Sequence, residues 1–408
     1  MRVPPHLLAA GALTLAMVGD SLVYAVIPAA AATYGLGAVG VSLVLSVNRF
    51  VRLALNPLVA SWLTRVGWRR GTVIGVVLAT VSTAGYAIAP GLAALLVARV
   101  AWGAAYATLR LTMFGYATTD RERSARRLGL AVGVQEIAPA VLLVVGASLL
   151  GLLGARWLFA ALALLSVLAL PLALALPRRS DATPRAAAVE SPGEALTGDA
   201  GEDQGGDPDG GRVRGLWRAS FATITVAFGV DGALTAGVVL TLLAFGSTPV
   251  EAAALGGVLL AARKVAQVTV SPAAGALAQR WGVTPTVTLG MLGTAAGLAG
   301  VALGHVLVGA LVASVAAASV AALTPAAVEG DGSASRMRAL GWLTTARDLG
   351  AASGAAFAPL ALVGAGAAAV VGWTFGVTAG IVLVATVVWV ATRARPGSSC
   401  SNLHDDVS

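Results

Sequence analysis

The feature that most constrains how this chain can fold is a succession of long apolar segments, joined by short stretches in which arginine is concentrated. A helix needs about 20 mostly apolar residues to cross the hydrocarbon core of a bilayer, and the apolar segments reach that length. Only 11% of the residues are charged, whereas soluble domains carry about 25%. The sequence therefore predicts an all-α membrane protein with twelve transmembrane helices in its 408 residues.

The predicted spans fall into two groups of six, with a polar segment between the groups. They cover residues 6–32, 39–63, 71–89, 92–116, 128–153 and 157–176, then 219–245, 250–277, two spans on either side of His305, 340–363 and 370–391. The segment between the groups is rich in Gly, Pro, Ala, Asp and Glu, so it cannot bury a core. We expect a first bundle at 1–177, a disordered linker at 178–215, a second bundle at 216–393 and a tail at 394–408.

A long-period repeat relates the two groups of spans. Residues 48–67 recur 215 positions later without a gap, and a second match is offset by 212. The matched residues are Asn48-Arg49 with Arg263-Lys264, Asn56-Pro57 with Ser271-Pro272, Gly129 with Gly341, and Glu136 with Asp348. Self-similarity over this distance in an apolar chain indicates two related halves. Gly350-x-x-x-Gly354 further predicts that the eleventh span packs closely on a neighbour.

The loop after the second predicted span carries Arg65-x-Gly67-x-Arg69-Arg70, and Arg280-x-Gly282 stands at the matching place in the second half. This pattern resembles the loop signature Gly-x-x-x-Asp-Arg-x-Gly-x-Arg-Arg of the major facilitator superfamily of secondary transporters. Ala60 and Thr64 replace the signature's glycine and aspartate, whereas the second copy keeps Gly275. The resemblance covers nearly the whole chain and implies two pseudo-symmetric six-helix halves. It implies a gating role for Arg65, Gly67, Arg69, Arg70, Gly275, Arg280 and Gly282.

The distribution of arginine predicts the orientation of the chain in the membrane. The loops after the second, fourth, sixth, eighth and tenth spans are rich in arginine, while the alternate loops hold little more than Arg156. Because basic loops stay on the cytoplasmic side, both termini and the linker should be cytoplasmic. We expect a multi-pass protein of the cell membrane that works as a monomer in the lipid bilayer.

Ionisable side chains within the predicted spans are the candidates for function, since each costs about 2.5–3.5 kcal/mol at mid-bilayer. We expect them to face a water-filled cavity between the halves, with structural ion pairs as the alternative. They are Asp20, Arg49, Arg52, Arg99, Glu136, Asp231, Arg263, Lys264, Arg347 and Asp348.

Asp20 and Arg99 are predicted to form a proton-coupling pair. The pattern Arg99-x-x-Trp102-Gly103 resembles the family's Arg-x-x-Gln-Gly motif, which in proton antiporters faces an acid of the first helix. Movement of the arginine would then alter how readily the carboxyl group takes up a proton. Ala138-Pro139 keeps the proline of a Gly-Pro motif that marks many exporters, so the resemblance favours proton-coupled efflux. The further acids predicted to serve coupling are Glu136, Asp231 and Asp348.

The basic residues within the spans predict the charge of the substrate. The list above holds six bases and four acids, and this excess favours an anionic or zwitterionic group on the substrate. The alternative is that the bases pair internally with Glu136 and Asp348. The residues predicted to bind substrate are Asn48, Arg49, Arg52, Arg263, Lys264 and Arg347, with a ring-lined wall of Tyr24, Trp102, Tyr106 and Trp342. Such aromatic side chains can equally be plain packing.

Other functional classes lack the residues that they need. An ATP-driven pump requires Gly-x-x-x-x-Gly-Lys-[Ser/Thr], and the single lysine follows an arginine. The three histidines are isolated, so no paired metal ligands and no base for a hydrolase are expected. The net charge of +8 sits in loops and does not indicate nucleic-acid binding.

We therefore predict a transporter rather than an enzyme, with a small-molecule substrate, protons as the coupling ion and no cofactor or metal. A proton-coupled importer of an organic anion remains the alternative to an exporter. The rival class is a non-transporting membrane receptor or assembly subunit on the same scaffold, against which the mid-membrane charges in both halves argue.

Overall fold

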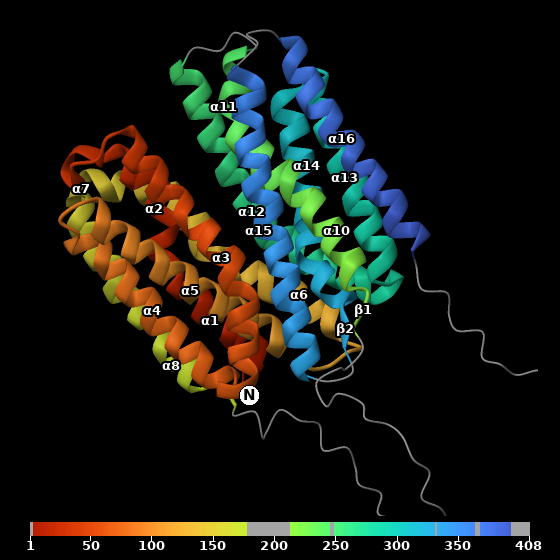
Figure 1. Cartoon of the computed structure of the whole chain (residues 1–408), viewed down its shortest axis with the longest axis horizontal. Helices are drawn as coiled ribbons and strands as arrows, with labels where there is room; N and C mark the ends of the chain where they lie inside the picture. The colour runs from red at the N-terminus through yellow and green to blue at the C-terminus, as the bar shows by residue number, and fades with distance from the viewer. Residues whose placement is uncertain (1–2, 178–212, 245–248, 331–332, 364–367, 393–408) are drawn as a thin grey trace, which may run out of the picture.

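The computed structural model describes residues 3–177, 213–244, 249–330, 333–363 and 368–392. The first half contains α1 (Pro5–Ala16), α2 (Val18–Ala29), the 3-10 turn η1 (Ala31–Tyr34), α3 (Ala38–Val66), α4 (Trp68–Ile88), α5 (Leu92–Ala117), α6 (Ser124–Gln135), α7 (Ile137–Val167) and α8 (Ala169–Leu174). Figure 1 shows these helices side by side in one bundle.

The second half forms another bundle beside the first (Figure 1). It contains α10 (Leu216–Val226), the π-helix η2 (Ala227–Leu234), α11 (Thr235–Ala244), α12 (Pro249–Trp281), α13 (Val283–Ala302), α14 (Val306–Leu323), the 3-10 turn η3 (Thr324–Ala327), α15 (Ser333–Val363) and α16 (Ala368–Ala391). Two short strands, β1 (Val213–Arg214) and β2 (Glu329–Gly330), pair antiparallel with Val213 opposite Gly330.

The helices follow the predicted spans in order, and the chain is an all-α membrane protein. Within the described residues, nine helices are long and apolar enough to cross a membrane, or ten if α1 and α2 count as one bent span. The two predicted spans outside that set are α12 and α15, which carry Arg263, Lys264, Arg347 and Asp348. These two helices are therefore the most polar of the predicted spans, and they lie at the centre of the site described below.

Several boundaries differ from the sequence prediction. α6 begins at Ser124 and α15 at Ser333, so helix already forms in stretches predicted as loops before residues 128 and 340. The predicted fifth and sixth spans join in α7 across Gly154, whose positive φ of 72° makes a kink. A hydropathy pattern marks where a helix enters lipid, whereas backbone hydrogen bonding can continue into the polar layer beyond.

The first span of each half is irregular near its acid. The predicted first span is broken into α1 and α2, which meet at a 46° bend next to Met17. The predicted seventh span contains the π-helix η2, which includes Asp231. Short π-helical segments occur often at functional sites because they redirect a side chain without ending the helix.

Val213 and Arg214 form β1, although the sequence places them in the linker. The remaining linker residues, 178–212, and the tail from 393 onwards lie outside the described residues, so the predicted disorder of the linker stays a prediction.

The two halves meet closely at one end of the molecule (Figure 1). There α6 packs on α12 so tightly that a Cβ at Gly129 would lie 2.4 Å from the carbonyl oxygen of Ser271. At the repeat-related contact of α15 with α3, a Cβ at Gly341 would lie 2.6 Å from the Cβ of Ala60. This end, where α3 stops at Val66 and α12 at Trp281, is called the closed end below. At the opposite, open end α2 and α7 diverge from α11 (Figure 1).

Candidate functional site

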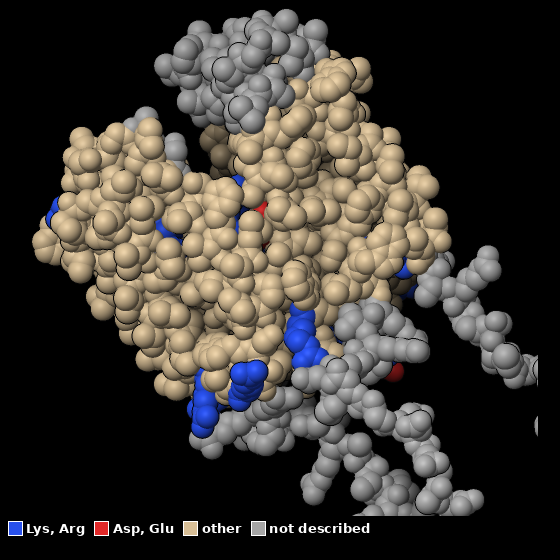
Figure 2. Space-filling view, viewed as in Figure 1, with Lys and Arg blue, Asp and Glu red and all other residues tan. Residues whose placement is uncertain are grey.

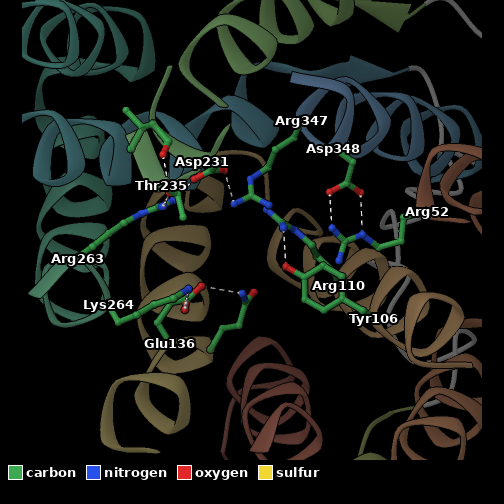
Figure 3. Close-up of polar contacts among 12 residues, drawn as sticks. Arg52, Tyr106, Arg110, Glu136, Asp231, Thr235, Arg263, Lys264, Arg347 and Asp348 are labelled. Carbon is green, nitrogen blue, oxygen red and sulfur yellow. Dashed lines mark hydrogen bonds and ion pairs between the residues drawn. The ribbon is translucent and has the colours of Figure 1, made fainter. Parts of the chain in front are cut away.

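The candidate site lies where the halves come together, at the bottom of a hollow between them. Figure 2 shows the surface hollowed between the two halves, with basic and acidic side chains visible at the bottom. Figure 3 shows the charged side chains of α3, α5, α12, α15 and η2 pointing toward one another, together with Glu136 from the α6–α7 junction. The structure thus brings together residues from both halves that the sequence predicted to be functional.

Arg52 of α3 binds Asp348 of α15 across the two halves. Its Nε and Nη2 donate to the two carboxylate oxygens at 3.0 and 2.8 Å, and Asn56 donates to the same carboxylate at 3.0 Å. The Asp348 side chain is only 5% exposed. This is a bidentate pair of the strong, directional kind, and it lies next to the close contact between Gly341 and α3.

Glu136 and Lys264 form the corresponding pair on the other side of the site. The Lys264 ammonium donates to Glu136 at 2.8 Å, and Gln135 donates to the second carboxylate oxygen at 3.0 Å. Glu136 and Asp348 are related by the repeat, and each binds a base from the second span of the opposite half. The internal pairing left open by the sequence is therefore present for Arg52 and Lys264.

Asp231 forms ion pairs with two arginines of the second half. Arg263 donates to one of its oxygens and also to Thr235, at 2.7 Å, while Arg347 lies 2.6 Å from the other oxygen. The contact depends on the predicted close packing of α15, because a Cβ at Gly350 would lie 2.2 Å from the carbonyl oxygen of Ile224.

A cavity of about 20 Å³ lies beside Asp231, Arg263 and Arg347. Thr223 and Gln267 also line it, and the Thr223 hydroxyl and the Gln267 carbonyl oxygen are buried without a hydrogen-bond partner. A polar cavity of this size has room for one water molecule. The two orphaned oxygens are therefore placed where a water could connect them to the Asp231 carboxylate.

Asp20 and Arg99 are in contact, as the sequence predicted. Arg99 is fully buried and donates to the Asp20 carboxylate. It also donates to the carbonyl of Val44 at 2.9 Å, to the Tyr24 hydroxyl at 3.3 Å and to the Tyr86 hydroxyl at 3.5 Å. Because four groups hold the guanidinium, the orientation of Arg99 toward Asp20 is fixed by its surroundings.

The other residues predicted to bind substrate are spread more widely. Trp102 and Tyr106 are buried with their ring centres 5.8 Å apart, whereas Tyr24 is 41% exposed. Trp342 is 56% exposed and makes none of the ring contacts found among the described residues. Asn48 is buried with its carbonyl oxygen unpaired, and half-buried Arg49 makes no hydrogen bond or ion pair in the described part of the chain.

The loop residues assigned to gating lie at the closed end. They stand apart from the charged cluster, which is made of the ion-paired residues Arg52, Glu136, Asp231, Arg263, Lys264, Arg347 and Asp348. Gly67 and Gly282 both have positive φ, 88° and 90°, and both precede the next helix directly. Gly275 packs against α6, where a Cβ would lie 2.7 Å from the carbonyl of Ala125. Arg65, Arg70 and Arg280 are exposed and Arg69 is partly so. The matching φ values confirm that the two loops repeat in structure as well as in sequence.

Arg110 of α5 was missed by the sequence analysis. It is 7% exposed and lies in the same cluster, with its Nη1 donating to the Tyr106 hydroxyl at 2.6 Å (Figure 3). Its position near the end of a predicted span suggests an arginine that extends to the surface. The signal that could have identified it is its helical spacing, since Arg99, Tyr106 and Arg110 share one face of α5.

Comparisons with known proteins agree with this architecture. The family model described as Major Facilitator Superfamily matches residues 9–262. The human organic anion transporter MFSD10 (TETRAN) has a similar structure, with a TM-score of 0.70 and 15% identity over 95% of this chain and 99% of that one.

Two further solved structures are similar at the level of the fold. A bacterial homologue of the iron transporter ferroportin, in an outward-facing state, gives a TM-score of 0.66 at 15% identity, covering 96% of this chain and all of that one. The proton:xylose symporter XylE gives 0.67 at 15% identity, covering 95% and 94%. No curated protein sequence matches the chain. Within the described residues, no group of three His, Cys, Asp or Glu side chains is arranged to hold a metal ion.

Proposed function

This chain belongs to the Major Facilitator Superfamily and is a transporter of the secondary kind, and from that premise we propose that it exchanges protons for a small organic anion or zwitterion across the cell membrane. In this proposal the halves rock about the charged cluster and expose it to the two sides in turn. The protein works as a monomer in the bilayer.

The contact between Asp20 and Arg99 is the observation that carries the proton-coupling part of the proposal. Arg99 is fully buried, and three further groups hold it in addition to Asp20. Asp20 itself is 14% exposed as a side chain, so its carboxylate is accessible to a proton. Uptake of a proton would neutralise the acid and weaken its hold on Arg99, which links the charge of Asp20 to the position of α5.

The charge balance of the cluster supports an anionic substrate group. The cluster holds five bases, Arg52, Arg110, Arg263, Lys264 and Arg347, and three acids, Glu136, Asp231 and Asp348. Excess positive charge in a partly desolvated site favours a negative ligand. The similar human structure is named an organic anion transporter, which agrees with this sign.

The direction of transport rests on the orientation of the molecule. Figure 2 shows basic side chains gathered at the end where Figure 1 marks the N-terminus, and such loops face the cytoplasm. The closed end would then be cytoplasmic and the hollow open to the outside, a state in which an exporter releases substrate. An importer would load substrate in the same state. The two directions are therefore distinguished by whether the proton gradient drives substrate out of the cell or into it. The ionisable side chains within the spans of both halves favour transport over a receptor or assembly role.

The proposal is tested with the protein in proteoliposomes, using a substrate identified by thermal-shift screening. An acid-inside pH gradient should drive accumulation of substrate inside the vesicles if the exchange is antiport, and an acid-outside gradient should do so for symport. Asp20→Asn should abolish accumulation driven by pH and keep substrate binding. Asp120→Asn, an acid in a surface loop, is the matched control and should transport normally. Accumulation by Asp20→Asn at the rate of the unaltered protein would show that the coupling acid lies elsewhere.

A further inference from the structure

Arg110 is a buried charge of the site that no ion pair among the described residues neutralises. Every acid of the cluster already binds a base directly, since Asp348 binds Arg52, Glu136 binds Lys264, and Asp231 binds Arg263 and Arg347. Arg110 has no carboxylate within ion-pair distance in the described part of the chain, and its Nε is buried without a hydrogen-bond partner. Burying an arginine without a counter-charge is costly, so such a residue needs a reason to persist.

The guanidinium of Arg110 is nevertheless held in one orientation. Its Nη1 donates to the Tyr106 hydroxyl, and the guanidinium carbon lies 5.6 Å from the centre of the Tyr106 ring and 5.2 Å from that of Phe114. Arg52 lies over the same Tyr106 ring, 4.8 Å from its centre. Contacts of this kind stabilise a cation and fix its plane but leave its charge uncompensated.

The edge of Arg110 that remains free is the Nε–Nη2 edge. Nη2 makes no hydrogen bond to any described residue, and Nε has no partner. In the same site, Arg52 uses this same edge to bind both oxygens of Asp348. Two parallel N–H groups match a carboxylate in width and direction. Arg110 therefore presents an edge suited to a carboxylate, and no described residue supplies that carboxylate.

The charges around Arg110 strengthen this reading. Arg347 and Arg52 act on it repulsively, and Asp348 is the acid that acts on it most strongly. Asp348 is already held by Arg52 and Asn56, so it is not available as a direct partner. A negative group brought in from solution would relieve the repulsion among three arginines at once.

We propose that Arg110 is the carboxylate-binding residue of the substrate site, taking a small organic carboxylate through its Nε–Nη2 edge with the Tyr106 ring beside it. This assignment rests on the proposed function in its choice of an anionic substrate and adds the residue and the chemical class. A bound carboxylate would then neutralise Arg110 of α5, beside the Arg52–Asp348 pair of α3 and α15.

The test measures thermal unfolding of the purified full-length protein with three carboxylates, acetate, benzoate and citrate, and with benzamide and inorganic phosphate as comparisons. At least one carboxylate should raise the midpoint of unfolding, because it binds the folded state, and benzamide should not. Arg110→Gln should weaken this carboxylate effect by about tenfold or more in concentration, the usual cost of losing a charged hydrogen bond. Arg110→Lys keeps the positive charge but lacks the two parallel N–H groups, so it should recover part of the stabilisation by carboxylate. Arg126→Gln, at an exposed position on α6, is the matched control.

The ligand-free variants provide a second readout that a merely structural arginine would not give. Removing an uncompensated buried charge should leave the ligand-free midpoint of Arg110→Gln unchanged or raised. A variant that unfolds several degrees earlier, or does not fold, would overturn the proposal, because Arg110 would then be needed for stability. Stabilisation by phosphate alone, by no carboxylate, or to the same degree in Arg110→Gln would overturn it as well. Binding is measured without a pH gradient. A failure of proton coupling through Asp20 would therefore not affect the test of carboxylate binding at Arg110, and a failure of carboxylate binding would not affect the test of coupling.

Discussion

Asp348 holds two groups of the first half at once, and that makes it the most sensitive single residue of the junction. Asp348→Asn should lower the free energy of unfolding by about 3–5 kcal/mol, because Arg52 would be left buried without its counter-charge. Asn56→Ala removes one hydrogen bond and should cost about 1 kcal/mol. Denaturant unfolding of the purified variants measures both.

The double variant Arg52→Gln/Asp348→Asn separates charge from shape at this position. It removes the stranded charge together with its partner, so part of the stability lost in the single variant should return. Equal stability of the single and double variants would mean that the pair contributes through packing alone.

Single residues also mark the limit of prediction from sequence. The contact of Asp20 with Arg99 could be predicted because the motif around Arg99 resembles one that faces an acid of the first helix. Arg110 could not, since its depth alone suggests a side chain that reaches the surface, and its burial depends on how α3, α5 and α15 pack. Arg52 and Lys264 were expected at the site, but only the fold shows that Asp348 and Glu136 already neutralise them.

At the scale of elements, the closed end depends on helices that approach within backbone contact. Gly275→Ala should disturb it, because the added Cβ would lie 2.7 Å from the carbonyl of Ala125 on α6. Gly257→Ala on the same helix has nothing within 4 Å of the added Cβ and should be neutral or stabilising by up to about 1 kcal/mol. The two midpoints of thermal unfolding, compared under one condition, check this. If Gly275→Ala is as stable as Gly257→Ala, α6 and α12 are not in such close contact.

The irregular elements show why helix existence was easier to predict than helix geometry. Length and hydropathy located the spans, and the repeat related the two halves. The break at Met17 and the π-helix around Asp231 cannot be detected from hydropathy. They change which carbonyl accepts each backbone hydrogen bond, but they do not change which residues are apolar. Gly350 and Gly354 pack against α10 and η2 at this place, and the Gly350-x-x-x-Gly354 spacing did predict that approach.

At the scale of the whole molecule, contacts rather than the connecting chain should hold the halves together. A protease site inserted between residues 178 and 212 should allow the chain to be cut with both halves still co-purifying in mild detergent. The ion pairs Arg52–Asp348 and Lys264–Glu136 cross between the halves. The close contacts of Gly129, Gly275 and Gly341 cross between them as well. Size-exclusion chromatography after cleavage makes the measurement, and Gly129→Leu, which places a bulky side chain at the α6–α12 contact, should promote separation. Halves that separate in the unaltered protein would show that the connection itself maintains the assembly.

The crosswise pairing of α3 with α15 and of α6 with α12 has a consequence for how the molecule could have arisen and diversified. The repeat relates α3 to α12 and α6 to α15, so the contact of α3 with α15 is the counterpart of the contact of α12 with α6. The same arrangement is found in a two-fold, isologous homodimer. In such a dimer one substitution changes both junctions together, since both are encoded once. In the present chain each junction has its own codons, and they have diverged to Arg52–Asp348 on one side and Lys264–Glu136, about one helical turn displaced, on the other. The single chain can thus adjust one junction while keeping the other, a freedom that a symmetric pair of identical subunits lacks.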